Sequence, residues 1–214
     1  MSERVSILRD GAERARAALE RCIAESGVAV FPADTVYGLA CDPLRPDAVH
    51  RVNALKGRDE GKPSAVMFFS PLGMRELVAT LGPRTGDALG ALLPGPVTVV
   101  VANPERRYPL ACGEDPERLG VRLIEGPLEG VRCAVLQTSA NRSGEPAPRA
   151  GGEIEPEILE GADLVIDGGE LPGTASTVVD VSALDAGGEW RVLREGALSS
   201  DELERLLADV VRRR

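Results

Sequence analysis

The chain of 214 residues has a hydrophobic content of 43%, which is enough for one good core or at most two small ones. Its formal net charge of −9, from 34 acidic and 25 basic residues, argues against a broad sequence-independent grip on nucleic acid, because that depends on dense Lys and Arg, but it leaves room for a local basic cleft. No stretch approaches the ~20 apolar residues of a membrane span and the first ten residues lack the apolar run of a signal peptide, so we expect a soluble, cytoplasmic protein without a membrane partner.

Helices and strands are predicted to alternate in the first half of the chain. Asp10 and Glu13 have the spacing of a helix capping box, and apolar residues then recur at helical intervals as far as Gly27. Pro46 is expected to open a later helix. The remaining apolar runs predict strands at 28–31, 39–41 and 65–69 and helices at 72–81 and 85–93.

The second half is dominated by short strands. Residues 97–102 are β-branched except for one alanine, which predicts a strand. Ser199 and Glu202 form a second capping box for a C-terminal helix. Further strands are predicted at 119–124, 133–136, 165–166, 177–181 and 190–193, with a helix at 153–160. Strands interleaved with fewer helices indicate one α/β domain over 1–214 with a mixed, twisted sheet.

Several common kinds of site are missing from the sequence. It contains neither of the two common Gly-rich phosphate loops. Its four cysteines are scattered without a CxxC pair, so we expect reduced, buried thiols and no protein-held metal. The single histidine, His50, falls on a predicted helix and favours a structural role, which argues against a Ser-His-Asp triad or a Cys-His dyad.

Four polar clusters lie beside predicted strands, and each has a plain alternative. Residues 31–39 place a carboxylate, a hydroxyl and a phenol in what is otherwise a simple turn. Residues 56–62 contain cations that suit phosphate binding, and the alternative is a solvated charged loop at the end of a helix. Residues 137–144 put hydroxyls and amides after a strand, where open α/β sheets bind ligands, or form a polar turn. Residues 176–180 and 194–197 are a fourth cluster, or the polar ends of a hairpin.

Taken together, these clusters resemble the YrdC-like family. The segments stand in the order typical of that family and span Val28 to Ala197: FPADTVYGLA, LKGRDEGKPSAV, LLPGPVTVVV, QTSANRSGEPAP, STVVDVS and VLREGA. The family signature of Lys-x-Arg and a distant Ser-x-Asn is present as Lys56, Arg58, Ser139 and Asn141. The resemblance implies a short single-domain form whose twisted mixed α/β sheet surrounds a deep, basic cavity.

The resemblance also implies an activity. Family members condense L-threonine, bicarbonate or CO2, and ATP into L-threonylcarbamoyladenylate and pyrophosphate, with Mg²⁺ on the phosphates. A downstream tRNA threonylcarbamoyl transferase then uses the product to modify tRNA. The chemistry fits the residue types, because two anionic reactants need cations and fixed donors around them and no protein nucleophile.

Site residues follow from the resemblance by motif matching. The catalytic group it implies is Lys56, Arg58, Ser139 and Asn141. The ATP contacts it implies are Lys56, Arg58, Lys62, Asn141, Arg149 and Arg194, and the L-threonine contacts are Thr35, Arg122, Ser139 and Ser176. The sequence departs from the usual family pattern at Ala33, at Met67 and at Leu123–Ile124 after Arg122.

Two alternative functions remain at this stage. A non-catalytic protein of the same fold could bind double-stranded RNA or tRNA through the basic cavity, but the complete Lys-x-Arg and Ser-x-Asn set favours the enzyme. A carbamoyl-phosphate-processing maturation domain would normally be part of a much longer chain.

Overall fold

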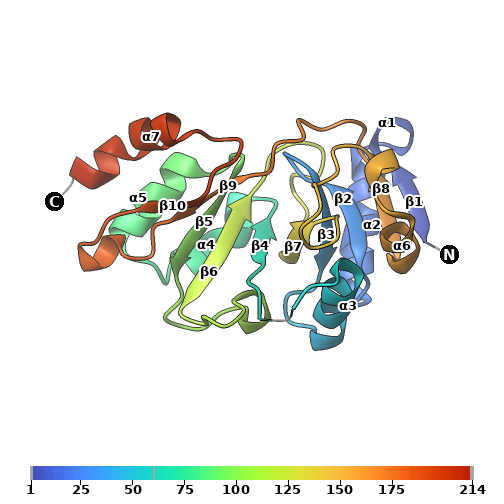
Figure 1. Cartoon of the computed structure of the whole chain (residues 1–214), viewed down its shortest axis with the longest axis horizontal. Coiled ribbons are helices and arrows are strands. Elements are labelled where there is room, and N and C mark those ends of the chain that lie inside the picture. Colours follow the sequence, from blue (N-terminus) through green and yellow to red (C-terminus); the bar gives the residue numbers. More distant parts are fainter. Residues whose placement is uncertain (1, 60, 213–214) are drawn as a thin grey trace.

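The structure, a computed structural model, describes residues 2–59 and 61–212, and one mixed sheet runs through it (Figure 1). The spatial order of the ten strands is β1-β8-β2-β3-β7-β4-β6-β5-β9-β10, with parallel and antiparallel pairs. The strands are β1 (Glu3–Ser6), β2 (Ala29–Pro32), β3 (Tyr37–Cys41), β4 (Ala65–Phe68), β5 (Val97–Ala102), β6 (Arg118–Leu123), β7 (Val135–Ser139), β8 (Leu164–Asp167), β9 (Thr177–Asp180) and β10 (Arg191–Arg194).

Seven α-helices are described, fewer than the strands, as the sequence predicted. They are α1 (Ile7–Asp10), α2 (Ala12–Ala24), α3 (Pro46–Lys56), α4 (Pro71–Val78), α5 (Pro83–Leu92), α6 (Pro156–Gly161) and α7 (Ser200–Arg212), and the short 3-10 helices are η1 (Pro109–Ala111), η2 (Gly151–Glu153) and η3 (Leu184–Ala186). Helices α5 and α7 lie side by side at the C-terminal end of the molecule (Figure 1). No described helix is long and apolar enough to cross a membrane.

The two predicted capping boxes had different outcomes. At the start of α7, Ser199 N donates to Glu202 Oε2 at 3.0 Å and Glu202 N donates to Ser199 Oγ at 3.4 Å, so this reciprocal box is confirmed. The box at Asp10 and Glu13 is wrong. Asp10 ends α1 and accepts a hydrogen bond from Ser6 N at 2.7 Å, because a strand and a short helix that the sequence analysis missed precede α2.

One face of the sheet is closed. Alternate residues of the central strands, such as Val99 and Val121, point toward helices α3 to α7 and form the larger apolar core. This alternation follows from the two-residue period of a strand, which places successive side chains on opposite faces. All of the site chemistry must therefore come from the other face.

The other face is only half covered. Helix α2 packs its apolar side on β1, β8 and β2, where Phe31 belongs to a second core. This core continues across the same face to Val135 of β7 and Met67 of β4. From Ala65 of β4 onward, the same face carries Gly120 and further small or polar residues that, like Ala65, belong to neither core. This uncovered part of the face, from Ala65 of β4 over β6, β5, β9 and β10, is called the open half below. The part that belongs to the second core, which includes Met67 at the other end of β4, is called the covered half.

Candidate active site

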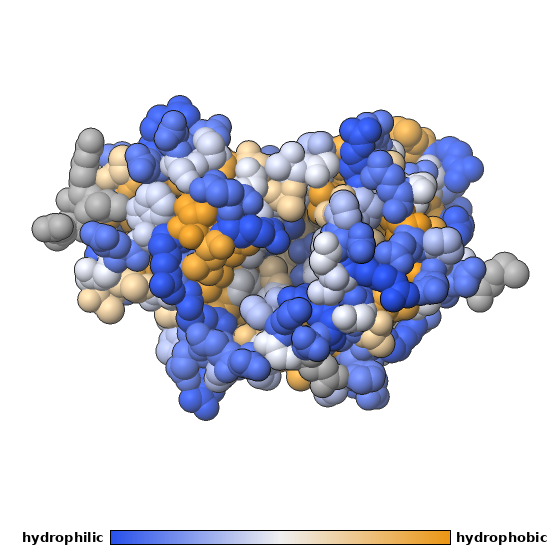
Figure 2. Space-filling view, in the orientation of Figure 1, coloured by the Kyte–Doolittle hydropathy of each residue, from blue (hydrophilic) through white to orange (hydrophobic). Residues whose placement is uncertain are grey.

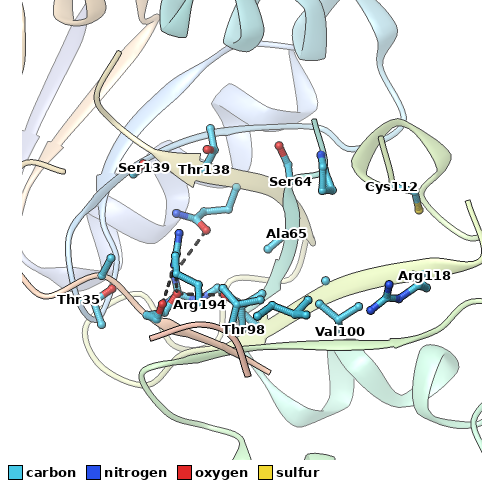
Figure 3. A pocket seen from close by; sticks show the side chains of 18 of the residues that line it. Thr35, Ser64, Ala65, Thr98, Val100, Cys112, Arg118, Thr138, Ser139 and Arg194 are labelled. Atoms are coloured by element: carbon cyan, nitrogen blue, oxygen red, sulfur yellow. Dashed lines mark hydrogen bonds between the residues drawn. The ribbon is translucent and has the colours of Figure 1, made fainter. Parts of the chain in front are cut away.

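A cavity of about 350 Å³ lies on the open half. Its floor comes from cavity-facing residues of four strands, which are Ala65, Thr98, Val100, Gly120, Arg122 and Gln137. A Cβ added at Gly120 would stand 3.4 Å from Thr98 Cγ2 and 3.7 Å from Ala65 Cα, so the missing side chain keeps the floor low. Thr35 and Ser139 lie toward one end of the cavity, and Cys112 and Arg118 toward the other (Figure 3).

Arg122 is the most enclosed cation of the cavity, with 3% of its surface exposed. Strand β6 directs its guanidinium toward Asp34, with which it forms an ion pair, and its Nη1 lies 3.5 Å from Gln137 Oε1. Burial lowers the pKa of Arg122, while Asp34 opposes that shift. The buried Nε has no hydrogen-bond partner, and such a donor is costly to leave unsatisfied.

Arg194 approaches the same end from β10. Its Nη2 donates to the Ser176 carbonyl oxygen at 2.7 Å and lies 3.4 Å from Ser176 Oγ. Ser176 Oγ is in turn 3.1 Å from Thr98 Oγ1. Burial, with a smaller contribution from Arg122, lowers the pKa of Arg194. Two partly desolvated arginines side by side create a strongly positive field for an anion.

Arg58 marks the edge of the cavity. Its Nη1 donates to Ser64 Oγ and Thr138 Oγ1, both at 3.1 Å, and its Nη2 donates to the Pro63 carbonyl oxygen. Burial lowers the pKa of Arg58 as well. The guanidinium therefore ties the segment after α3 to β7 and still lines the cavity.

The structure gathers six of the predicted site residues around the cavity, and these are Thr35, Arg58, Arg122, Ser139, Ser176 and Arg194. Four others do not line it. Lys56 is buried behind the 139–141 segment, and Asn141 donates from Nδ2 to the Glu145 carbonyl oxygen at 2.5 Å. Lys62 lies at the surface 3.7 Å from Asp59. Arg149 pairs with Glu153 and Glu170.

The sequence analysis missed part of the cavity wall. Val100, Val178 and Leu193 make it apolar on one side, and Leu193 is 48% exposed. Figure 2 shows apolar surface beside a hollow near the middle of the molecule, over β9 and β10. The usable signal was the strand alternation that sets Thr98 and Val100 on the face opposite the buried valines of β5.

Arg118 and Cys112 define the far end of the cavity, and the sequence analysis assigned neither. Arg118 forms an ion pair with Asp180, which also accepts from Arg191 Nε at 3.0 Å. Burial raises the pKa of the Cys112 thiol, which disfavours a reactive thiolate. Among the described residues, no three His, Cys, Asp or Glu side chains gather into a group that could hold a metal ion. The lining therefore offers cations and hydroxyl groups rather than an activated nucleophile.

Sequence comparison places this set of residues in a known family. Residues 21–196 match the Sua5, YciO and YrdC family, which is described as "Telomere recombination". This chain belongs to that family. It is 34% identical over 157 residues to a threonylcarbamoyl-AMP synthase of Pseudomonas aeruginosa, covering 72% of this chain and 84% of the relative. A Pyrococcus abyssi protein of the same name is 28% identical over 200 residues, covering 88% of this chain and 56% of that protein.

Solved structures confirm the fold of this family member. The P. abyssi Sua5 structure complexed with L-threonine matches with a TM-score of 0.78 and 26% identity, covering 97% of this chain and 61% of that one. The chain thus spans about 60% of P. abyssi Sua5. E. coli YciO matches with a TM-score of 0.73 over 92% of this chain and 97% of its own, at 22% identity, which supports the fold alone. The predicted twisted mixed sheet with a deep basic cavity is confirmed.

Proposed function

We propose that this family member is a threonylcarbamoyl-AMP synthase, a nucleotidyltransferase that makes threonylcarbamoyl-AMP and pyrophosphate from L-threonine, bicarbonate or CO2, and ATP. The observation that carries the proposal is the convergence of Arg58, Arg122 and Arg194 on one cavity lined with hydroxyl groups. Curated relatives named for this activity support it. The reaction joins two anions, so a cationic cavity with fixed donors is the chemistry it requires.

Arg122 is proposed to bind the threonine carboxylate. Its guanidinium belongs to the cavity lining and is already desolvated and oriented. Asp34 and Gln137 hold the guanidinium in place, which reduces the entropy lost on binding. The side chains of Thr35, Ser139 and Ser176 lie on the same cavity and would recognise the threonine hydroxyl. A site built to pair a hydroxyl discriminates strongly against an analogue without one.

Arg58 and Arg194 are proposed to stabilise the nucleotide phosphates. The threonine nitrogen attacks CO2 and loses a proton, which gives a carbamate. A carbamate oxygen then attacks the α-phosphorus of ATP, and the bond to the β-phosphate oxygen breaks to release pyrophosphate. The two arginines neutralise charge that shifts from the nucleophile to the leaving group. The apolar wall of Val100, Val178 and Leu193 is proposed to hold the base away from that charge.

Mg²⁺ is proposed to enter with ATP rather than to occupy a protein site. Among the lining residues that the structure describes, Asp115 is the one carboxylate, while the nearby Asp34 and Asp180 are paired with arginines. Mg²⁺ is commonly held by substrate phosphates, water and one or two carboxylates, so this donor set fits a metal carried by the nucleotide. Four of the predicted ATP contacts do not line the cavity, so any effect that they have on the nucleotide would be exerted from outside the lining. These are Lys56, Lys62, Asn141 and Arg149.

The product would pass to a downstream tRNA threonylcarbamoyl transferase, which would place the protein in the cytoplasm. The deciding test is pyrophosphate release from ATP, which should require both threonine and bicarbonate. Threonine should be used much more efficiently than alanine. The alternative reading predicts tight, salt-resistant binding of duplex RNA or tRNA without such turnover, and that result would overturn the enzyme.

A further inference from the structure

The ammonium of Lys56 is enclosed by protein oxygen atoms. Lys56 is 4% exposed, although it is the last residue of α3. Its Nζ donates to the Ser139 carbonyl oxygen at 2.5 Å, to the Asn141 carbonyl oxygen at 2.7 Å and to Asn141 Oδ1 at 3.3 Å. An ammonium has three donors, so these contacts use all of them and leave none for a phosphate.

The backbone around Lys56 explains why it points away from the cavity while Arg58 points toward it. Gly57 ends α3 in the left-handed conformation with φ of 55°, and the chain turns so that Arg58 N donates to the Asn53 carbonyl oxygen at 3.0 Å. Glycine adopts this conformation without steric cost. One residue of the signature therefore lies behind the 139–141 segment and the other at the cavity edge.

The end of α3 makes a second connection to the same segment. Ser143 N donates to the Lys56 carbonyl oxygen at 2.8 Å, so backbone and side chain of Lys56 both hold residues 139–143. A lysine suits the position because its compact ammonium meets three oxygen atoms from different directions, whereas the planar fork of an arginine would not. The chain has 23 arginines and only one other lysine, Lys62, which lies at the surface.

We infer that Lys56 is a positioning residue, which fixes Ser139 on the cavity wall by clamping the 139–143 backbone from behind rather than by touching the phosphates. The inference rests on the proposed function only for the consequence of that positioning. The clamp itself exists in the ligand-free protein and can be measured without turnover. Loss of the clamp should impair threonine and ATP use together, because Ser139 lines the threonine side and directly follows Thr138, which accepts a hydrogen bond from Arg58 on the phosphate side.

The first test uses the fact that Lys56 and Lys62 are the only lysines. Ligand-free protein is treated with acetic anhydride, and mass spectrometry follows acetylation of each lysine. We expect Lys62 to react at least about tenfold faster than Lys56, since a buried amine reacts only through local opening. Lys56 should stay unreactive whether or not ATP is present. Fast labelling of Lys56 in the free protein that ATP then blocks would overturn the inference, because that is the behaviour of a phosphate ligand.

The second test compares Lys56→Met with Lys62→Met, which removes the same charge from the surface. Hydrogen exchange of the 139–143 amides in ligand-free protein should accelerate by about tenfold or more in Lys56→Met and stay unchanged in Lys62→Met. In the turnover assay, Lys56→Met should lower kcat/KM for threonine and for ATP by similar factors. Unchanged exchange combined with a loss confined to ATP would overturn the inference. Absence of turnover in the wild type would refute the proposed function and leave the exchange result standing.

Discussion

The covered and open halves of one sheet face have the same strand geometry and opposite contents. In the covered half the face carries large apolar side chains such as Phe31, Met67 and Val135, each fully buried. Over β4, β6 and β5 it carries Ala65, Gly120 and Thr98, and a cavity takes the place of a helix. In the covered half the side chains are constrained by packing in the core, whereas in the open half they are constrained by the ligand that the cavity would bind. This difference makes stability and activity separable by mutation.

The largest expected effect is on stability in the covered half. Phe31 is fully buried and meets the Phe69 ring edge-on at a centroid distance of 6.3 Å. Phe31→Ala should lower the free energy of unfolding by about 3–5 kcal/mol, because it removes buried apolar surface and leaves a cavity. Chemical denaturation measures this loss.

Two valines on the same face give a matched control. Val135→Ala, in the covered half, should cost about 2 kcal/mol from two lost methyl groups and incomplete collapse. Val100→Ala, on the cavity wall, should cost about 1 kcal/mol or less and should act mainly on ATP use. Equal destabilisation by the two changes would break the distinction between the halves.

In the open half, the largest expected effect is on the nucleotide. Arg58→Met removes a partly buried cation from the cavity edge. Loss of one charge-assisted contact costs about 1.5–3 kcal/mol, so kcat/KM for ATP should fall by roughly 10- to 150-fold. Arg106→Met is the control, since Arg106 makes a surface ion pair with Glu117 whose contribution should be small. Full adenylate synthesis by Arg58→Met at limiting ATP would show that this cation does not act on the phosphates.

The sequence predicted the fold better than the contacts of the site. Apolar periodicity located the central strands and α3 because burial on one or both faces leaves a local pattern. It missed β1 and α1, whose short segment has little apolar period, and it ended β7 at Leu136 although the strand continues to Ser139. Which side of a segment a side chain faces depends on tertiary packing, so motif matching grouped Lys56 with Arg58 although only Arg58 lines the cavity.

A smaller effect is expected at the apolar wall of the open half. Leu193 is 48% exposed beside the cavity, and Leu206 is 43% exposed on α7. If a base packs on the wall, Leu193→Ser should raise KM for ATP by about fivefold, since only part of a leucine surface is buried by the ligand. KM for threonine should stay unchanged. Leu206→Ser loses a similar exposed surface and should leave both constants unchanged. An equal rise for both substrates in Leu193→Ser would argue against a base at this wall.

The pH dependence of turnover tests the contacts by which Lys56 holds the 139–143 backbone behind the cavity. Burial, with a smaller contribution from the Arg58 cation, lowers the pKa of Lys56 to about 8. The ammonium is therefore present below that pH and lost above it, and a neutral amine donates to only two of the three surrounding oxygen atoms. The loss of one hydrogen bond, about 0.5–1.5 kcal/mol, should lower kcat about two- to tenfold as pH rises through 8. Titration of the substrate amine affects the wild type and Lys56→Met equally, so the ratio of their kcat values reports the titration of Lys56 alone. A ratio that stays constant across pH 7 to 9.5 would contradict it.

At the floor of the cavity, the effect of a substitution should depend only on the size of the added side chain, and it should be smallest for alanine. Gly120 lies on β6, and a Cβ there would make ordinary contacts with Thr98 at 3.4 Å and Ala65 at 3.7 Å. Gly120→Ala should therefore fold normally, with stability within about 1 kcal/mol of the wild type because alanine also reduces the entropy of the unfolded chain. Its kcat/KM should change by less than about threefold. Gly120→Leu occupies the same position with a side chain that projects into the cavity, so it should abolish turnover while the protein stays folded, because no covering helix opposes the added volume. Far-UV circular dichroism and thermal unfolding establish folding, and pyrophosphate release measures turnover.

In the covered half, a similar enlargement at a buried alanine, Ala40→Leu, should instead destabilise the protein by about 1–3 kcal/mol through overpacking. If Gly120→Leu unfolds the protein as Ala40→Leu does, the open half is packed like the covered half and the cavity does not exist as described.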